Sequence, residues 1–164
     1  MAISSLSALW FLPFVLPICF YVAFTDMREM RITNQAVIVL ALVFVVIGPF
    51  VMPFGEYGGR LLQLVGVLVV GIVLNAAGAV GAGDAKFAAA AAPYIAVGDL
   101  RLLFIIFAAN LLAAFATHRL ATYTPLRRIA PGWESWDKGW DFPMGLSLGG
   151  TLGIYLIMGA VYGS

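Results

Sequence analysis

Hydrophobic residues form long runs along most of this 164-residue chain. No charged residue interrupts the runs at positions 9–24, 36–54, 61–80, 102–116 and 144–161. A helix needs about 20 apolar residues to cross the roughly 30 Å hydrocarbon core of a bilayer. The pattern therefore predicts membrane-spanning helices. It excludes a transmembrane barrel, whose strands would alternate apolar and polar residues.

A weaker segment between the third and fourth of these runs adds one more predicted span. We expect an all-α membrane protein, a bundle of six transmembrane helices that forms one domain over residues 1–164. The predicted spans are residues 8–24, 36–54, 61–80, 85–97, 102–117 and 143–162. The fourth reaches only about 20 Å at 1.5 Å per residue. It also carries Lys86 and Pro93, so we expect a short helix enclosed by its neighbours.

Composition narrows the class of protein further. Hydrophobic residues make up 63% of the chain and charged residues 10%, whereas a soluble domain has about 25% charged residues. A soluble enzyme and a disordered chain are thus excluded. The net charge of +1 includes no basic stripe, so we expect no nucleic-acid partner. Cys19 is the only cysteine and cannot build a Cys-rich zinc site. We expect no metal and no cofactor.

Lysine and arginine are distributed unevenly between the predicted loops. Seven of the nine fall in the first, third and fifth loops: Arg28, Arg31, Lys86, Arg119, Arg127, Arg128 and Lys138. The tails and the other two loops carry only Arg60 and Arg101. Because cytoplasmic loops are enriched in basic residues, this distribution predicts that the odd-numbered loops are cytoplasmic. Both termini are then expected on the periplasmic side, outside the membrane.

Two aspartates occupy corresponding positions in this topology. Asp26 directly follows the first predicted span, and Asp84 directly precedes the fourth. Two full spans lie between them, so both carboxylates are expected at the cytoplasmic boundary. Taken singly, Asp26 is explained as a solvated charge beside the membrane, and Asp84 as an N-cap of the fourth helix.

Together, the two carboxylates support a specific chemistry. Two carboxyl groups that lie close together share a proton and titrate as a unit. The ionised group can take a proton from water while the protonated group polarises a carbonyl. Gly81 and Gly83 suit such a site because glycine lets the backbone approach a substrate closely.

Three motifs in the chain resemble those of one known family. Gly81-Ala82-Gly83-Asp84-Ala85-Lys86 resembles the Gly-x-Gly-Asp-x-Lys motif of type IV prepilin peptidases, which are intramembrane aspartic proteases. Residues 26–34, which read DMREMRITN, resemble the family's Asp-x-Arg-x-x-x-Ile-Pro-Asn segment, with Thr33 in place of proline. Phe142-Pro143-Met144-Gly145 resembles the Phe-Pro-x-Gly segment that opens the last helix. The three motifs occur in the family's order.

This resemblance implies an activity and a set of site residues. It implies that Asp26 and Asp84 are the catalytic pair, and that further residues position the backbone or the substrate: Gly81, Gly83, Lys86, Pro143 and Gly145. The implied substrate is a prepilin or pseudopilin precursor, cut after a glycine at the cytoplasmic edge of its hydrophobic helix. The implied location is the inner membrane, with the lipid bilayer as a partner. Contacts with other pilus-assembly membrane proteins are left open.

The short first loop indicates one branch of the family. Bifunctional members carry a large cysteine-containing, zinc-binding insertion there and also methylate the product, whereas this chain has only residues 25–35 and no cysteine among them. The chain therefore resembles the short, peptidase-only branch associated with Flp (tight-adherence) pili. Alternatives are an archaellin-type preprotein peptidase, a small proton- or cation-coupled transporter that uses the paired acids, and a non-catalytic subunit of a secretion complex.

The longest polar segment, residues 119–141, has a pattern of its own. Trp133, Trp136 and Trp140 follow helical spacing. We interpret the segment as an amphipathic helix that lies at the lipid headgroups. A second hypothesis is that its acids Glu134, Asp137 and Asp141 control entry of the substrate's basic leader.

Overall fold

Six α-helices make up most of the computed structural model, which describes residues 1–139 and 141–164. They are α1 (Ser5–Glu29), α2 (Asn34–Val51), α3 (Phe54–Ala76), α4 (Ala82–Ala91), α5 (Leu100–Thr122) and α6 (Met144–Tyr162). Four short 3-10 segments are η1 (Ala92–Tyr94), η2 (Val97–Asp99), η3 (Pro125–Ile129) and η4 (Glu134–Trp136). The described residues contain no strand, so the all-α prediction is confirmed.

Five of the helices are long and apolar enough to span a membrane. These are α1, α2, α3, α5 with the preceding η2, and α6. The prediction of six spans therefore needs correction at α4. Its 10 residues extend only about 15 Å. As expected from the sequence, α4 is enclosed by its neighbours, and Ala85, Phe87 and residues 89–91 are buried.

The bounds of α3 differ most from the prediction. The helix begins at Phe54 rather than near residue 61, so Arg60 lies inside it rather than in a loop. Arg60 is tolerated there because Glu56, one turn earlier, forms an ion pair with it at 2.8 Å. At the other end, α3 stops at Ala76 rather than near residue 80. Gly78 follows with a φ of 74°, a left-handed conformation that terminates helices.

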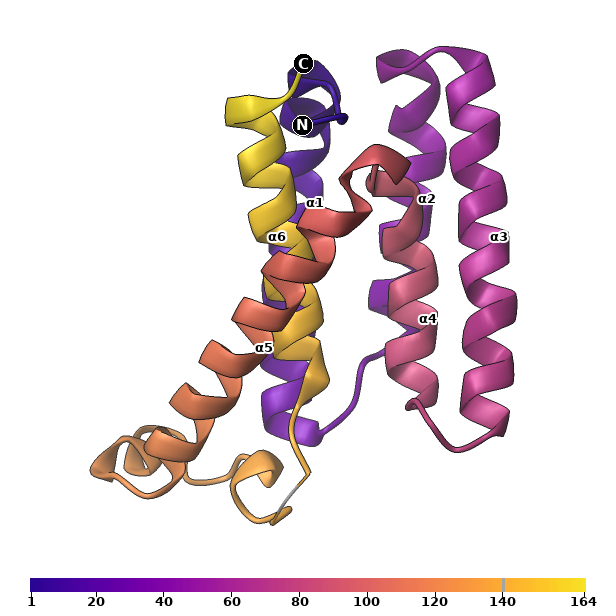
Figure 1. Cartoon of the computed structure of the whole chain (residues 1–164). Coiled ribbons are helices and arrows are strands. Elements are labelled where there is room, and N and C mark those ends of the chain that lie inside the picture. Colours follow the sequence, from indigo (N-terminus) through magenta and orange to yellow (C-terminus); the bar gives the residue numbers. More distant parts are fainter. Residues whose placement is uncertain (140) are drawn as a thin grey trace.

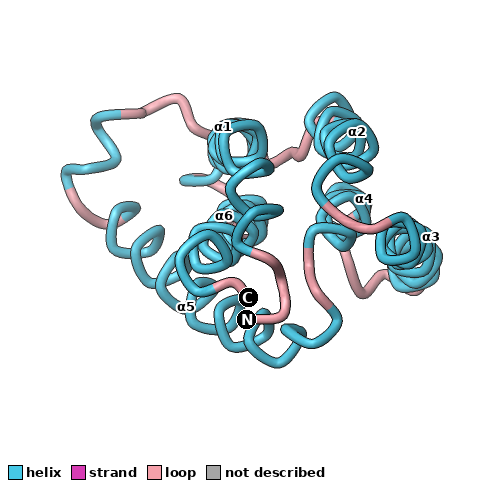
Figure 2. Tube along the Cα trace, turned by 90° about the horizontal axis from the view of Figure 1, so that it is seen from above, coloured by secondary structure: helices cyan, strands magenta, loops and turns pink. Residues whose placement is uncertain are grey.

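The helices form two groups of three. Figure 1 and Figure 2 show α1, α5 and α6 on one side and α2, α3 and α4 on the other. The most extensive packing is between α1 and α6. Small residues allow it, since a Cβ added at Gly149 of α6 would lie 2.8 Å from the carbonyl oxygen of Cys19 in α1.

An aromatic cluster joins the two groups. The rings of Phe11 in α1, Phe44 in α2 and Tyr94 in η1 lie 4.8–5.6 Å apart, centroid to centroid. All three side chains are buried. The Tyr94 hydroxyl donates a hydrogen bond to the carbonyl of Leu40 at 2.7 Å, which satisfies the one polar atom of the cluster. This core holds α2 and the end of α4 against α1.

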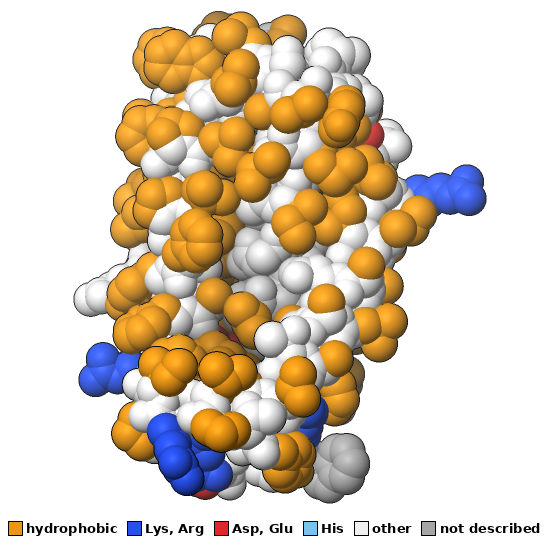
Figure 3. All heavy atoms as spheres, turned by 90° about the vertical axis from the view of Figure 1, so that its left-hand side faces the viewer, with side chains coloured by type: hydrophobic (Ala, Val, Ile, Leu, Met, Phe, Trp, Pro, Cys, Tyr) orange, Lys and Arg blue, Asp and Glu red, His pale blue; other side chains and the backbone are white. Residues whose placement is uncertain are grey.

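Both termini lie at one end of the bundle, as Figure 1 shows. The ammonium group of Met1 donates a hydrogen bond to the carbonyl of Tyr162 at 3.1 Å. The face in Figure 3 is covered along its length by hydrophobic side chains. Lysine and arginine lie mainly at the end opposite the two termini. The distribution of charge predicted from the loops is therefore present in the folded molecule. The side of the membrane on which each end lies stays a prediction.

The predicted amphipathic helix in residues 119–141 is wrong. α5 continues to Thr122, and only the short segments η3 and η4 follow. Gly139 has a φ of 62°, which a regular helix over 133–141 does not allow. Trp133 and Trp136 stack on each other with ring centroids 5.6 Å apart, and Trp136 is buried against His118. The predicted place of Trp140 lies outside the described residues.

Candidate active site

Asp26 lies in the last turn of α1. The helix ends at Met30, which adopts a left-handed conformation (φ 49°) and donates its N–H to the Asp26 carbonyl. The Asp26 side chain is only 6% exposed. Its Oδ2 accepts a hydrogen bond of 2.6 Å from the backbone N–H of Gly145, at the start of α6. A backbone donor at a helix N-terminus is well suited to hold a carboxylate.

Asp84 lies in the first turn of α4, where a negative charge is favoured by the helix dipole. The interpretation of Asp84 as the N-cap is wrong, because Gly81 occupies that position and no side chain makes a capping hydrogen bond. The carboxylate is half-buried. Its orientation is therefore not explained by capping of its own helix.

The two carboxylates line one cavity. It has a volume of about 930 Å³ and is bordered by the end of α1, the start of α2, the start of α4 and the segment that leads into α6. Asp26 and Asp84 thus lie at the same end of the bundle, as two intervening helices predict. Burial raises the pKa of Asp84 to about 6, and the nearby charge of Asp26 adds to the rise. The pair is therefore arranged so that one proton is retained more easily than on a free aspartate.

Two glycines of the motifs pack against the two aspartates, and a third packs against Ile32. A Cβ added at Gly81 would lie 2.7 Å from Oδ2 of Asp84, and one at Gly145 would lie 2.8 Å from Cβ of Asp26. At Gly83 the added atom would lie 3.2 Å from the side chain of Ile32, in the loop after α1. At Gly81 and Gly145 a larger residue would displace the neighbouring aspartate, and at Gly83 it would press on Ile32.

The remaining candidate residues contribute to the framework of the cavity. Nζ of Lys86 donates a hydrogen bond to Oδ1 of Asn34 at 3.0 Å, which links α4 to the start of α2. Pro143 is fully buried and precedes the first residue of α6. Thr33, which stands in place of the motif's proline, caps α2 by accepting a hydrogen bond from the N–H of Ala36. Thr33 thus fixes the start of α2.

Lys138 was not predicted from the sequence as a site residue, and Asp141 was named only in the hypothesis that acidic residues control entry of the leader. Lys138 and Asp141, from the loop between α5 and α6, line the cavity together with Phe142. Their position in the sequence could have indicated a place at the site, because both residues come shortly before the Phe142-Pro143 segment. Among the described residues, no group of three His, Cys, Asp or Glu side chains could hold a metal ion.

Comparison with known proteins identifies the family. A model of the type IV leader peptidase family matches residues 13–117, well over half of the chain. The match includes Asp26 and the motif at residues 81–86, whereas residues 142–145 lie beyond it. Neither the curated proteins nor the solved structures include a match. The family model confirms the resemblance found in the motifs, and the chain belongs to the type IV leader peptidase family, which consists of aspartic peptidases.

Proposed function

We propose that this protein cleaves the leader peptide from type IV prepilins or pseudopilins, and that Asp26 and Asp84 are its catalytic pair. The observation that carries the proposal is that these two carboxylates, from α1 and α4, line one cavity at one end of the bundle. Membership of the family supports the reaction class. The hydrogen bond from Gly145 to Asp26 supports a positioning role for the segment that opens α6.

The reaction is the hydrolysis of one peptide bond. The ionised carboxylate takes a proton from a water molecule, and the oxygen of that water attacks the scissile carbonyl carbon. The protonated carboxyl donates its proton to the carbonyl oxygen. Collapse of the tetrahedral diol breaks the C–N bond: the carboxyl that took the water proton passes it to the leaving amine, and one diol hydroxyl returns its proton to the other carboxylate, which restores the starting pair. The raised pKa of Asp84 supports a pair that holds one shared proton and titrates as a unit.

We assign the cavity to the cytoplasmic face of the inner membrane. The basic residues at that end support the orientation. The short connection between α1 and α2, residues 30–33, supports a peptidase without a methyltransferase insertion, as in the branch associated with Flp pili.

Co-expression with candidate precursors tests the substrate. The protein should shorten a short Flp-type prepilin, and the mass of the product should place its new N-terminus after a glycine. An archaellin-type precursor serves as the comparison. Preferential cleavage of that precursor would overturn the assignment to Flp pili, and an intact N-terminus on every precursor would overturn the proposed activity.

A further inference from the structure

A second cavity continues the path that begins at the two aspartates. Its volume is about 300 Å³, and it lies between α4, α5 and α6, with Gln63 and Val67 of α3 also on its wall. Its wall is almost entirely apolar and includes Phe87, Ala88, Ala91, Leu103, Phe104 and Leu148. We call it the α4–α6 groove.

We call the cavity lined by Asp26 and Asp84 the active cavity; it shares two helices with the groove. Ala88 lies one helical turn after Asp84 on α4, and Leu148 lies one turn after Met144 on α6. Asp84 and Met144 line the active cavity, whereas Ala88 and Leu148 line the groove. Along α4, the stretch from Asp84 to Ala91 is about 10 Å long. The polar and apolar cavities therefore follow one line along the bundle.

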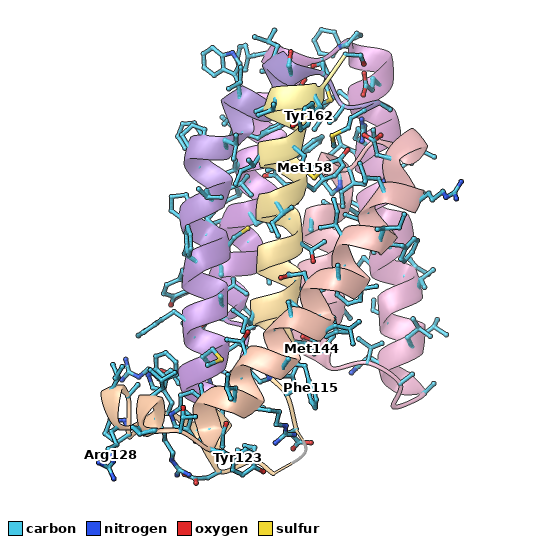
Figure 4. The ribbon with its side chains drawn as sticks, turned by 60° about the vertical axis from the view of Figure 1, so that its left-hand side comes forward. Phe115, Tyr123, Arg128, Met144, Met158 and Tyr162 are labelled. Atoms are coloured by element: carbon cyan, nitrogen blue, oxygen red, sulfur yellow. The ribbon has the colours of Figure 1, made fainter. Side chains whose placement is uncertain are left out.

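The arrangement of α5 leaves this line open from the side. α5 packs mainly on α6, and only Ala114 and His118 are buried within it. In Figure 1, α5 starts near the end of α4 and then runs away from it. Figure 4 shows α5 crossing α6 obliquely, with Phe115 and Met144 toward the end that carries the active cavity. α5 therefore does not close the space beside the first turns of α4.

We propose that the α4–α6 groove binds the hydrophobic helix of the precursor and thereby places its cleavage junction beside Asp26 and Asp84. This inference rests on the proposed function. An apolar helix that becomes polar at its end matches a groove that is apolar beside Ala88 and polar at the active cavity, where Lys138 and Asp141 lie. The small side chains of Ala88 and Ala91 permit the close helix approach that is typical of packing in membranes.

Another apolar cleft of the bundle does not offer this path. It has a volume of about 250 Å³ and is lined only by residues of α1 and α6, among them Leu16, Phe20 and Ile157. No residue of α4 borders it, so a helix bound there would not run alongside Asp84. Since it is also apolar and includes the exposed Phe20, it provides matched control positions.

Disulfide cross-linking tests the groove directly. Phe104 in the groove and Phe20 in the control cleft are 65% and 70% exposed, so Phe104→Cys and Phe20→Cys are comparable variants. Both are made with Cys19→Ala, which removes the native thiol, and with Asp84→Asn, which leaves the precursor uncleaved. Single cysteines are placed along the precursor's apolar segment. Phe104→Cys should cross-link at helical spacing, and Phe20→Cys should not. Equal cross-linking of the two, as expected for a groove filled by lipid, would overturn the inference.

A rate measurement provides the second readout. Leu103 and Leu16 are both half-buried residues that line the groove and the control cleft, respectively. Leu103→Trp should lower kcat/KM for the full-length precursor at least about tenfold, equivalent to about 1.4 kcal/mol, while Leu16→Trp stays close to wild type. A wild-type protein that cleaves no precursor contradicts the proposed function. If Leu103→Trp is as active as Leu16→Trp, the proposed binding of the precursor in the groove is contradicted, while the proposed peptidase activity stands.

Discussion

At the scale of single residues, Asp84 has a charge that its surroundings disfavour. Burial and the charge of Asp26 raise its pKa to about 6, compared with about 3.9 for a free aspartate. The folded protein therefore binds more protons at this site than the unfolded chain between these two pH values. Because of this difference, stability falls as the pH rises through that window.

Replacing Asp84 with asparagine should therefore stabilise the protein at neutral pH. The melting temperature of Asp84→Asn in detergent should exceed that of wild type by a few degrees, because the amide carries no charge. The difference should shrink as the pH falls through about 6 toward about 4. Thermal unfolding at a series of pH values measures this. Glu29→Gln removes an exposed acid three residues from Asp26 and should show no such gain; an equal gain there would contradict the explanation.

Gly145 offers a second test at this scale. In Gly145→Ala the new Cβ would lie 2.8 Å from Cβ of Asp26 and 3.0 Å from its Oδ2, so the carboxylate must move. A misplacement of about 1 Å is expected to cost about 100-fold in kcat. Initial rates of precursor cleavage measure the loss. Gly66→Ala, where an added Cβ meets nothing within 4 Å, is the control and should retain activity. Full activity of Gly145→Ala would show that this contact is unimportant.

The contribution of Gly145 illustrates what the sequence predicts at the scale of residues. The motif indicates that residues 142–145 belong near the site. It does not indicate that the Gly145 N–H holds Asp26, because that bond depends on how α6 packs on the end of α1. Likewise, the sequence places Lys86 beside Asp84, but the bond from Lys86 to Asn34 depends on the position of α2.

At the scale of elements, the apolar runs predict the long helices well, while polar residues inside helices are the source of error. The start of α3 was missed because Arg60 interrupts the pattern, and its partner Glu56 keeps it within the helix. The tryptophan spacing was misleading because Pro131, Gly132 and Gly139 prevent a continuous helix. Tryptophans at spacings of three and seven residues are insufficient evidence for a helix when proline and glycine lie within the same segment.

One connection between elements was not predicted. Asp99, which is 6% exposed, accepts hydrogen bonds from the N–H groups of Ala2 and Ile3 at 2.8 and 3.0 Å. It also accepts one from the hydroxyl of Tyr155 in α6 at 2.9 Å. An acid next to an apolar span is costly unless it has partners. The position of Asp99 beside such a span was therefore the signal in the sequence that it forms hydrogen bonds. Asp99 thus holds the N-terminal segment against α5 and α6.

Asp99→Ala should destabilise the protein without impairing the site. It leaves buried donors unpaired, at about 1–3 kcal/mol each, so the melting temperature should fall clearly. Asp99→Asn keeps one acceptor oxygen and should lose less. Precursor cleavage below the melting temperature should continue in both variants, because Asp99 lies at the end opposite the active cavity. A melting temperature equal to wild type in Asp99→Ala would contradict the proposed role of this cluster.

At the scale of the whole molecule, an even number of helices between two points explains why both lie at the same end of the bundle. Two crossings separate Asp26 from Asp84, and the termini meet through Met1 and Tyr162. The rule applies although α4 is too short to span a bilayer, because the chain continues through η1 and η2 to the end of the bundle that carries the termini. The oblique course of α5 was not predictable, since it depends on which faces of α5 and α6 pack.

Labelling of single cysteines tests the predicted orientation. In a Cys19→Ala background, Ser164→Cys should react with a membrane-impermeant thiol reagent added to intact cells. Arg128→Cys, in the loop at the opposite end, should react only after the inner membrane is opened. The reverse pattern would place the active cavity on the periplasmic side and contradict the positive-inside assignment.

The most direct test of the central claim, that Asp26 and Asp84 form one catalytic unit, is the rate at which purified variants shorten a prepilin. Asp26→Asn and Asp84→Asn should both fold, and each should lose at least about a thousandfold in kcat, as expected for members of one catalytic group. Glu29→Gln should cleave at the wild-type rate. A well-folded Asp26→Asn or Asp84→Asn protein that still produces the shortened prepilin at a rate near that of wild type would contradict the account.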